Sequence, residues 1–346
     1  MGETTSISWT DKTFNPWEGC TKVSPGCSAC YAETRNARFG GGTAPNWGKG
    51  RPRRRTSAAN WKLPLKWNRE AAAKLLSWET FRDSLGVTDA KLLEGGHVKP
   101  ERPRVFCASL ADWLDDEAPI AWLADLLKVI RETPNLDWQL LTKRIGNFEL
   151  LIRDVLDLST GPKPDAFYLW LRGWLKGEAP ANVWLGTSVE DQTRAEERIH
   201  KLLAIPAKVR FLSMEPLLGE VDLTRVNFPT GCLENVLKTD VNEIAKRAGI
   251  DKINGIDWVI AGGESGKGAR PCNVEWIRSL VAQCKAASAA CFVKQLGADP
   301  RHNTSGTCAI TGEWVGITNS PMTISDKKGG DMAEWPEDLR IRQFPV

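Results

Sequence analysis

The 346-residue sequence predicts an α/β protein in which parallel strands and helices alternate to form a partial (β/α) barrel of the TIM type. Six short runs are apolar without alternation, as in strands that are buried on both faces. Amphipathic stretches separate several of these runs, and regular strand–helix alternation favours parallel βα units. The expected strands are residues 104–109, 138–142, 183–188, 209–213, 257–262 and 290–294, and the clearest helices are 119–131, 193–203 and 274–286.

The N-terminal segment before the first of these strands contains three closely spaced cysteines, Cys20, Cys27 and Cys30, in the pattern C-x6-C-x2-C. Thiolates bind soft metals, and a closed zinc site normally needs four protein ligands. No fourth ligand is apparent near these cysteines. A four-iron cluster held by three thiolates keeps one iron open for an outside ligand. A closed structural zinc site remains the alternative.

Basic and aromatic residues follow the cysteines, in an insertion near residues 40–100. The arginines Arg51, Arg53, Arg54 and Arg55 lie between tryptophans, an arrangement that suits a nucleic-acid backbone with stacked or flipped bases. A solvated basic loop is the alternative. The net charge of +3 is too small to indicate a nucleic-acid partner by itself.

Polar residues follow almost every expected strand. In a βα barrel the carboxyl ends of the strands meet at one rim, where active sites are built. Helix caps and turns explain some of these residues individually, but six in succession favour a shared site. The residues are Ser109 with Asp112, Lys143 with Arg144, Ser188 with Glu190 and Asp191, Ser213 with Glu215, Glu264 with Ser265, and Lys294 with Gln295.

The cysteine loop and these strand ends resemble the radical S-adenosylmethionine (SAM) superfamily, and most closely a phage-encoded branch with the same early cysteine loop. The matching segments are 7–11, 15–20, 140–144, 184–191, 215–219, 262–266 and 329–345. The first cysteine gap is six residues rather than the commonest three, and Ala29 stands where an aromatic residue is usual. Gly262-Gly263-Glu264 lies too late in the chain to be the superfamily's SAM-binding Gly-Gly-Glu motif.

The resemblance implies a [4Fe–4S] cluster on the three cysteines, SAM as cosubstrate and a 5′-deoxyadenosyl radical. It also implies an electron donor such as flavodoxin or ferredoxin. By strand order, Ser109 or Asp112 is expected to contact the SAM amino group. Lys143, Ser188 and Glu190 are expected to contact its ribose or carboxylate, and Glu215 and Glu264 to face the substrate.

The expected function is modification of a hypermodified pyrimidine, a thymidine derivative, in phage DNA, with an isomerase favoured. A DNA photoproduct lyase is the enzymatic alternative, and a zinc-stapled DNA-binding protein without catalysis is the alternative of another class. The barrel is expected over residues 1–298, with its cluster loop at 15–35, and a C-terminal extension over 299–346. No apolar run is long enough to cross a membrane, and the N-terminus has no signal-like pattern, so a cytoplasmic location is expected.

Overall fold

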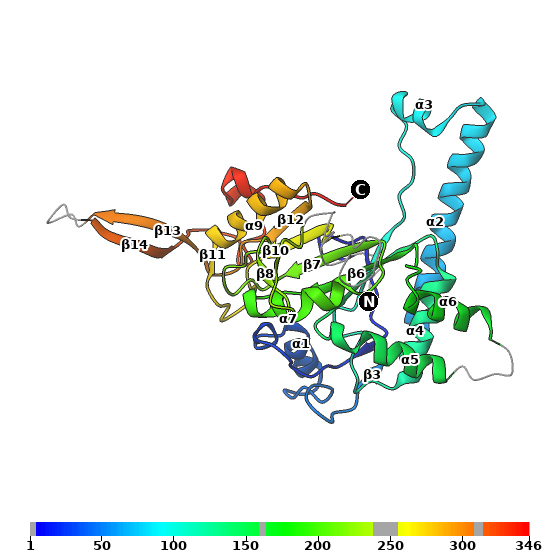
Figure 1. Cartoon of the computed structure of the whole chain (residues 1–346), viewed down its shortest axis with the longest axis horizontal. Helices are drawn as coiled ribbons and strands as arrows, with labels where there is room; N and C mark the ends of the chain where they lie inside the picture. Colours follow the sequence, from blue (N-terminus) through cyan, green and yellow to red (C-terminus); the bar gives the residue numbers. More distant parts are fainter. Residues whose placement is uncertain (1–4, 159–163, 238–254, 308–313, 346) are drawn as a thin grey trace.

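A seven-stranded parallel sheet, curled into a half-barrel, forms the centre of the molecule (Figure 1). The computed structural model describes residues 5–158, 164–237, 255–307 and 314–345. In spatial order the strands are β1 (Lys12–Thr13), β4 (Arg104–Cys107), β5 (Asp137–Thr142), β6 (Val183–Ser188), β7 (Val209–Met214), β10 (Trp258–Gly262) and β12 (Ala290–Gln295). The predicted partial barrel is confirmed, and each of the six expected strands is present.

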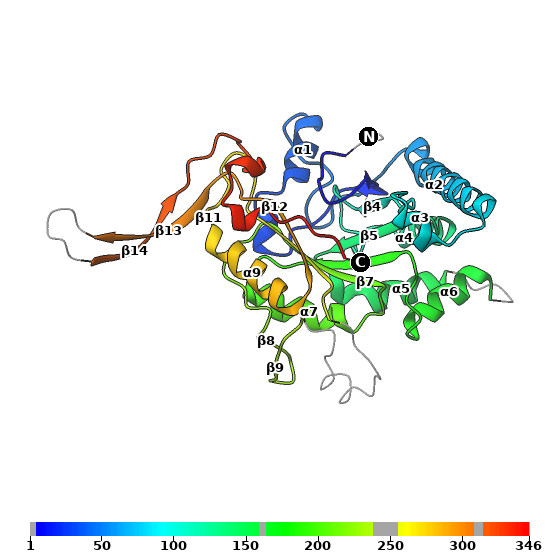
Figure 2. The same ribbon diagram turned by 90° about the horizontal axis from the view of Figure 1, so that it is seen from above.

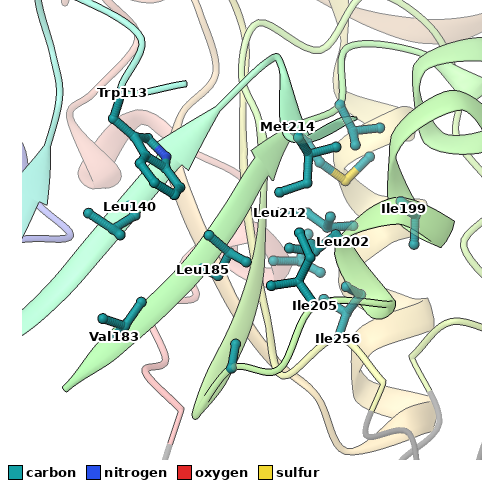
Figure 3. Packing of buried hydrophobic residues seen from close by; sticks show 14 of the residues in the cluster. Trp113, Leu140, Val183, Leu185, Ile199, Leu202, Ile205, Leu212, Met214 and Ile256 are labelled. Atoms are coloured by element: carbon teal, nitrogen blue, oxygen red, sulfur yellow. The ribbon is translucent and has the colours of Figure 1, made fainter. Parts of the chain in front are cut away.

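One face of the sheet is covered by helices, and the side chains between them form the main core. Leu140, Leu185 and Leu212, from three neighbouring strands, pack in this layer with Ile199 and Leu202 (Figure 3). All five are completely buried. The helices are α4 (Ile120–Glu132), α5 (Phe148–Asp157), α6 (Ala166–Leu175), α7 (Gln192–Leu203) and α9 (Val274–Ala287).

The opposite face of the sheet carries a second, mainly aromatic cluster. Trp184, Phe211 and Trp258 come from three adjacent strands and are joined by Trp9 from the N-terminal segment. Gly186 makes room for one of these rings, because a Cβ atom there would lie 2.4 Å from the ring of Phe211. Since both faces of the sheet are buried, its strands are apolar without alternation.

The region predicted as a basic insertion contains a loop and a helical arm. Helix α1 (Tyr31–Phe39) precedes it, the loop includes β3 (Arg54–Arg55), and the arm consists of α2 (Ala58–Leu85) and α3 (Asp89–Glu94). Figure 1 shows the arm projecting from the body of the molecule. Among the described residues, no helix is long and apolar enough to cross a membrane.

The C-terminal region leaves the body as an antiparallel hairpin and then returns to it (Figure 2). The hairpin strands are β13 (Pro300–Thr307) and β14 (Trp314–Pro321), and β13 also pairs with the short β11 (Cys272–Asn273). After the hairpin the buried Trp335 packs into the main core. Phe344 then lies 5.4 Å from Trp258, measured between ring centroids.

Candidate functional site

The cysteine loop starts beside the carboxyl end of β4 and ends at the first helix. The amide of Gly19 donates a hydrogen bond to the carbonyl oxygen of Leu110, three residues beyond that strand, at 3.1 Å. Cys27 ends a short 3₁₀ turn, and Cys30 is the residue immediately before α1. All three cysteines are partly exposed. The loop therefore lies at the rim where the strand-end polar residues were predicted to meet.

Arg144, after β5, holds the first part of the loop. Its guanidinium donates to the Sγ atom of Cys20 at 3.3 Å and to the carbonyl oxygen of Thr21 at 2.6 Å. Asp112 forms an ion pair with it at 3.3 Å. Burial would lower the pKa of Arg144, but the charges of Asp112 and Cys20 outweigh this effect and raise it. Arg144 is therefore a permanent cation beside the Cys20 sulfur.

Glu190, after β6, holds the middle of the loop and is completely buried. Its Oε1 atom accepts a hydrogen bond from Ser24 at 2.5 Å, and its Oε2 atom accepts one from Arg198 at 2.9 Å. A Cβ atom on Gly26 would lie only 2.4 Å from Oε1. Gly26 is thus needed for close approach of the loop to Glu190, one residue before Cys27.

Arg270, after β10, holds the same part of the loop from the other side. It donates to the carbonyl oxygen of Pro25 at 2.8 Å and forms two side-chain hydrogen bonds with Glu264. Burial would raise the pKa of Glu264, but the hydrogen bonds from Arg270 lower it overall. The pKa of Arg270 is raised, first by Glu264 and also by the charges of Glu190 and Cys27.

A cation of the rim acts on each cysteine: Arg144 contacts the sulfur of Cys20, and the charges of Arg270 and Lys143 act on Cys27 and Cys30. Burial raises the pKa of Cys30, and the charge of Lys143 opposes this. Burial also raises the pKa of Cys20 to about 12. Metal coordination or a cluster would deprotonate such thiols, and the nearby cations would then compensate the charge of the thiolates.

The metal group that the cysteine loop could hold depends on how far apart the thiols lie. Within the described ranges, no three His, Cys, Asp or Glu residues are arranged to hold one metal ion. Two thiolates bound to one zinc at about 2.3 Å must lie roughly 4 Å apart. In a [4Fe–4S] cluster each cysteine binds a different iron, so the thiols are further apart. Cys20, Cys27 and Cys30 would be the ligands.

The predicted SAM contacts are partly brought together at the rim. The Nζ atom of Lys143 donates to the Oγ atom of Ser188 at 3.0 Å and lies 4.0 Å from Oε1 of Glu190. Asp112 is nearby, but its carboxylate accepts hydrogen bonds from the side chain of Thr142 and the amide of Lys143. Asp112 therefore orders the end of β5 in this structure. Its contact with SAM, like those of the other residues, remains a prediction.

Ser109 and Glu215 lie on other parts of the same rim. Ser109 exchanges side-chain hydrogen bonds with Asn15, and its carbonyl oxygen accepts one from the hydroxyl group of Tyr31. Glu215, after β7, accepts hydrogen bonds from Lys294 at 2.6 Å and from Gln295 at 3.0 Å, both at the end of β12. Glu264 differs from Glu215 because its charge is used to hold Arg270 and, through it, the cysteine loop.

The four predicted nucleic-acid contacts have different environments. The side chain of Arg53 is 0% exposed and pairs with Asp115 at 2.6 Å, so this guanidinium is not presented to solvent. Arg55 pairs with Asp125 and lies over the ring of Trp61. Arg51 is exposed. The side chain of Arg54 is 61% exposed and pairs with Glu18. Of the four arginines, Arg51 and Arg54 are therefore the two most accessible to solvent.

Sequence reasoning missed Arg270, Ser24 and the role of Gly26. Arg270 belongs to no motif, and its distance from the cysteines along the chain gives no sign that it meets Pro25. The contact between Gly26 and Glu190 joins residues 164 positions apart. For Arg270 the sequence offers one signal, a charged residue shortly after the Gly262-Gly263-Glu264 segment.

A family model described as "Protein of unknown function (DUF5131)" matches residues 4–330 of the chain. The comparison with curated proteins gives no match, and neither does the comparison with solved structures. The match covers the half-barrel, the cysteine loop and the helical arm together.

Proposed function

Because the chain belongs to the DUF5131 family, whose description states no function, we propose its function from the site itself: a radical SAM enzyme. The observation that carries the proposal is the position of the cysteine loop. Arg144, Glu190 and Arg270, each from a different strand end of the half-barrel, hold it at the rim. A bound [4Fe–4S] cluster with one open iron would supply the electron that cleaves SAM to a 5′-deoxyadenosyl radical.

The residues of this chain would then divide into two groups. Asp112, Glu190 and Glu264 keep the loop and its cationic neighbours in place, because their carboxylates are engaged with protein groups. Ser109, Lys143 and Ser188 are partly or fully buried at the rim and offer polar side chains for SAM. Glu215 is paired with Lys294 further along the rim, on the side proposed for the substrate.

The proposed substrate is a nucleobase in DNA, with isomerisation of a modified pyrimidine favoured. The exposed Arg51 and Arg54 support this, since they follow the cysteine loop and can reach phosphates from solvent. A photoproduct lyase would use the same cofactor and DNA. In either case the cluster needs an electron donor such as flavodoxin or ferredoxin.

Anaerobic reconstitution with iron and sulfide tests the proposal directly. We expect a brown protein with about four irons per chain that releases 5′-deoxyadenosine from SAM under reducing conditions. The matched control is the triple variant C20A/C27A/C30A, which should do neither. A colourless protein that takes up one zinc and no iron would contradict the enzymatic proposal and support the DNA-binding alternative. Product analysis on phage-type modified DNA and on irradiated DNA separates the isomerase from the lyase.

A further inference from the structure

Arg144 has an unusually restricted environment for a side chain at an active-site rim. Only 8% of its side chain is exposed. The two terminal nitrogens of its guanidinium divide their contacts between Cys20 Sγ and the Thr21 carbonyl oxygen. Its orientation therefore follows from the loop backbone as well as from the thiol.

Acidic groups behind Arg144 fix it from the other side. Asp112 lies 3.3 Å away, and Asp115 lies 4.0 Å away. Both carboxylates are themselves held, Asp112 by the amide of Lys143 and Asp115 by Arg53. The guanidinium cannot turn away from Cys20 without leaving these buried partners, and breaking buried ion pairs is costly.

We propose that Arg144 tunes the reduction potential of the cluster that Cys20 helps to bind. This inference rests on the proposed function. Reduction adds one negative charge to a cluster, and the potential depends on net charge and on hydrogen bonds to the sulfurs. An N–H donor and a positive charge beside the Cys20 sulfur stabilise the reduced form, and screening is weak at a buried position. Arg144 is a positioning residue in this scheme, since it acts through the thiolate.

The other two rim cations provide an internal comparison. Lys143 donates to Ser188, and Arg270 donates to Glu264 and Pro25. Their described hydrogen bonds go to oxygen, whereas one from Arg144 goes to sulfur. We therefore expect Arg144 to have the largest effect on the potential.

The experiment is a redox titration of the reconstituted full-length protein without SAM, followed by electron paramagnetic resonance. In R144Q the reduction equilibrium should shift at least tenfold toward the oxidised cluster, which lowers the potential by about 59 mV or more for one electron. R144K should shift it less. R153Q, which changes an exposed arginine paired with Glu149 on α5, is the matched control and should leave it unchanged. An R144Q potential equal to that of wild type overturns the inference.

A second measurement covers the case in which R144Q does not retain iron. Wild-type protein containing ¹⁵N-arginine should show a nitrogen coupling to the reduced cluster, which R144K loses and R270K keeps. Absence of the coupling in wild type overturns the inference. If wild type binds no cluster at all, the proposed function fails and the inference with it. If wild type binds a cluster but the R144Q potential is unchanged, only the inference fails.

Discussion

Two groups of cationic side chains in this molecule have different surroundings. Lys143 and Arg144 follow β5, Arg270 follows β10, and all three act on the cysteine loop. The arginines of residues 51–55 are consecutive or nearly so, yet two of them are turned onto Asp115 and Asp125 of the same protein. Cations from two distant parts of the sequence thus converge on one loop, while the arginines of residues 51–55 are partly neutralised by ion pairs.

The difference shows that charge density along the sequence is a poor measure of a binding surface. Arg53 sits in a basic run but has a side chain with no exposed area, and it completes a buried ion pair. Arg144 and Arg270 have no comparable run around them, but the fold aims both at the loop that carries Cys20 and Cys27. A site is built by the strand ends that converge on it.

The largest expected effect concerns the cysteines themselves. Single replacement of Cys20, Cys27 or Cys30 by alanine should abolish the visible absorbance of the reconstituted protein and its cleavage of SAM, because each thiolate would bind its own iron in the proposed cluster. Iron analysis and 5′-deoxyadenosine release measure the two properties. C232A, which changes a cysteine outside the loop, is the control. SAM cleavage at wild-type rate in any of the three variants would contradict the assignment of that cysteine.

The second effect tests whether the rim positions the loop. In G26A the new Cβ atom would lie 2.4 Å from Oε1 of Glu190, so the loop must move away from the carboxylate. We expect cluster content to fall several-fold while the thermal unfolding temperature changes little. G219A is the matched control, because a Cβ atom there meets its nearest neighbour, Cβ of Asp191, at 3.9 Å. Full cluster loading in G26A would show that Glu190 does not determine the position of the loop.

The fold was largely predictable from the sequence because the sheet is buried on both faces. The runs 183–188 and 209–213 supply Val183, Leu185 and Leu212 to the main core and Trp184, Val209 and Phe211 to the aromatic cluster. Strand β1 is not among the six expected runs, because two residues give no periodicity to recognise. The helical arm α2–α3 was expected only as an insertion, since its composition is mixed and most of its surface is exposed.

The site was predictable in its parts but not in its connections. The positions of the cysteines and of Lys143, Ser188 and Glu190 follow from motif spacing and from the parallel arrangement of the strands. The contacts of Glu190 with Ser24 and of Arg270 with Pro25 join distant segments, and a single sequence contains no signal for them. Asp191, one of the strand-end residues, is a helix cap whose side chain accepts from the amide of Arg194.

A third prediction separates the buried arginine from its exposed neighbour. R53A should lower the free energy of unfolding by about 3–5 kcal/mol, because it removes the nearest cationic partner of the buried Asp115 carboxylate and leaves Arg144 at 4.0 Å. R51A, which changes an exposed arginine of the same run, should change it by less than about 0.5 kcal/mol. Urea denaturation followed by circular dichroism measures both variants. If R53A and R51A were equally stable, the pair of Arg53 with Asp115 would contribute nothing to the free energy of unfolding. The difference in burial between Arg53 and Arg51 would then have no effect on stability.

The smallest expected effect concerns DNA binding by the exposed arginines. Each phosphate contact contributes about 0.9 to the slope of log affinity against log salt concentration on duplex DNA, because counterions are released. If Arg51 contacts a phosphate, R51A should reduce the slope on a short mixed-sequence duplex by about 0.9. R54A should reduce it by less, since Arg54 must give up part of its interaction with Glu18 to reach a phosphate.

The control for this measurement is R153A, on the outer helix α5, which should leave the slope unchanged. Arg53 is not a suitable test residue, because a lower affinity in R53A would report lost stability as well as lost charge. An unaltered slope in R51A and R54A would make the exposed arginines an ordinary solvated surface and would remove the support they give to a DNA substrate. The radical SAM proposal would stand in that case, since it depends on the cysteine loop and the strand ends. The substrate would then have to be sought among molecules that contact Glu215 and Lys294.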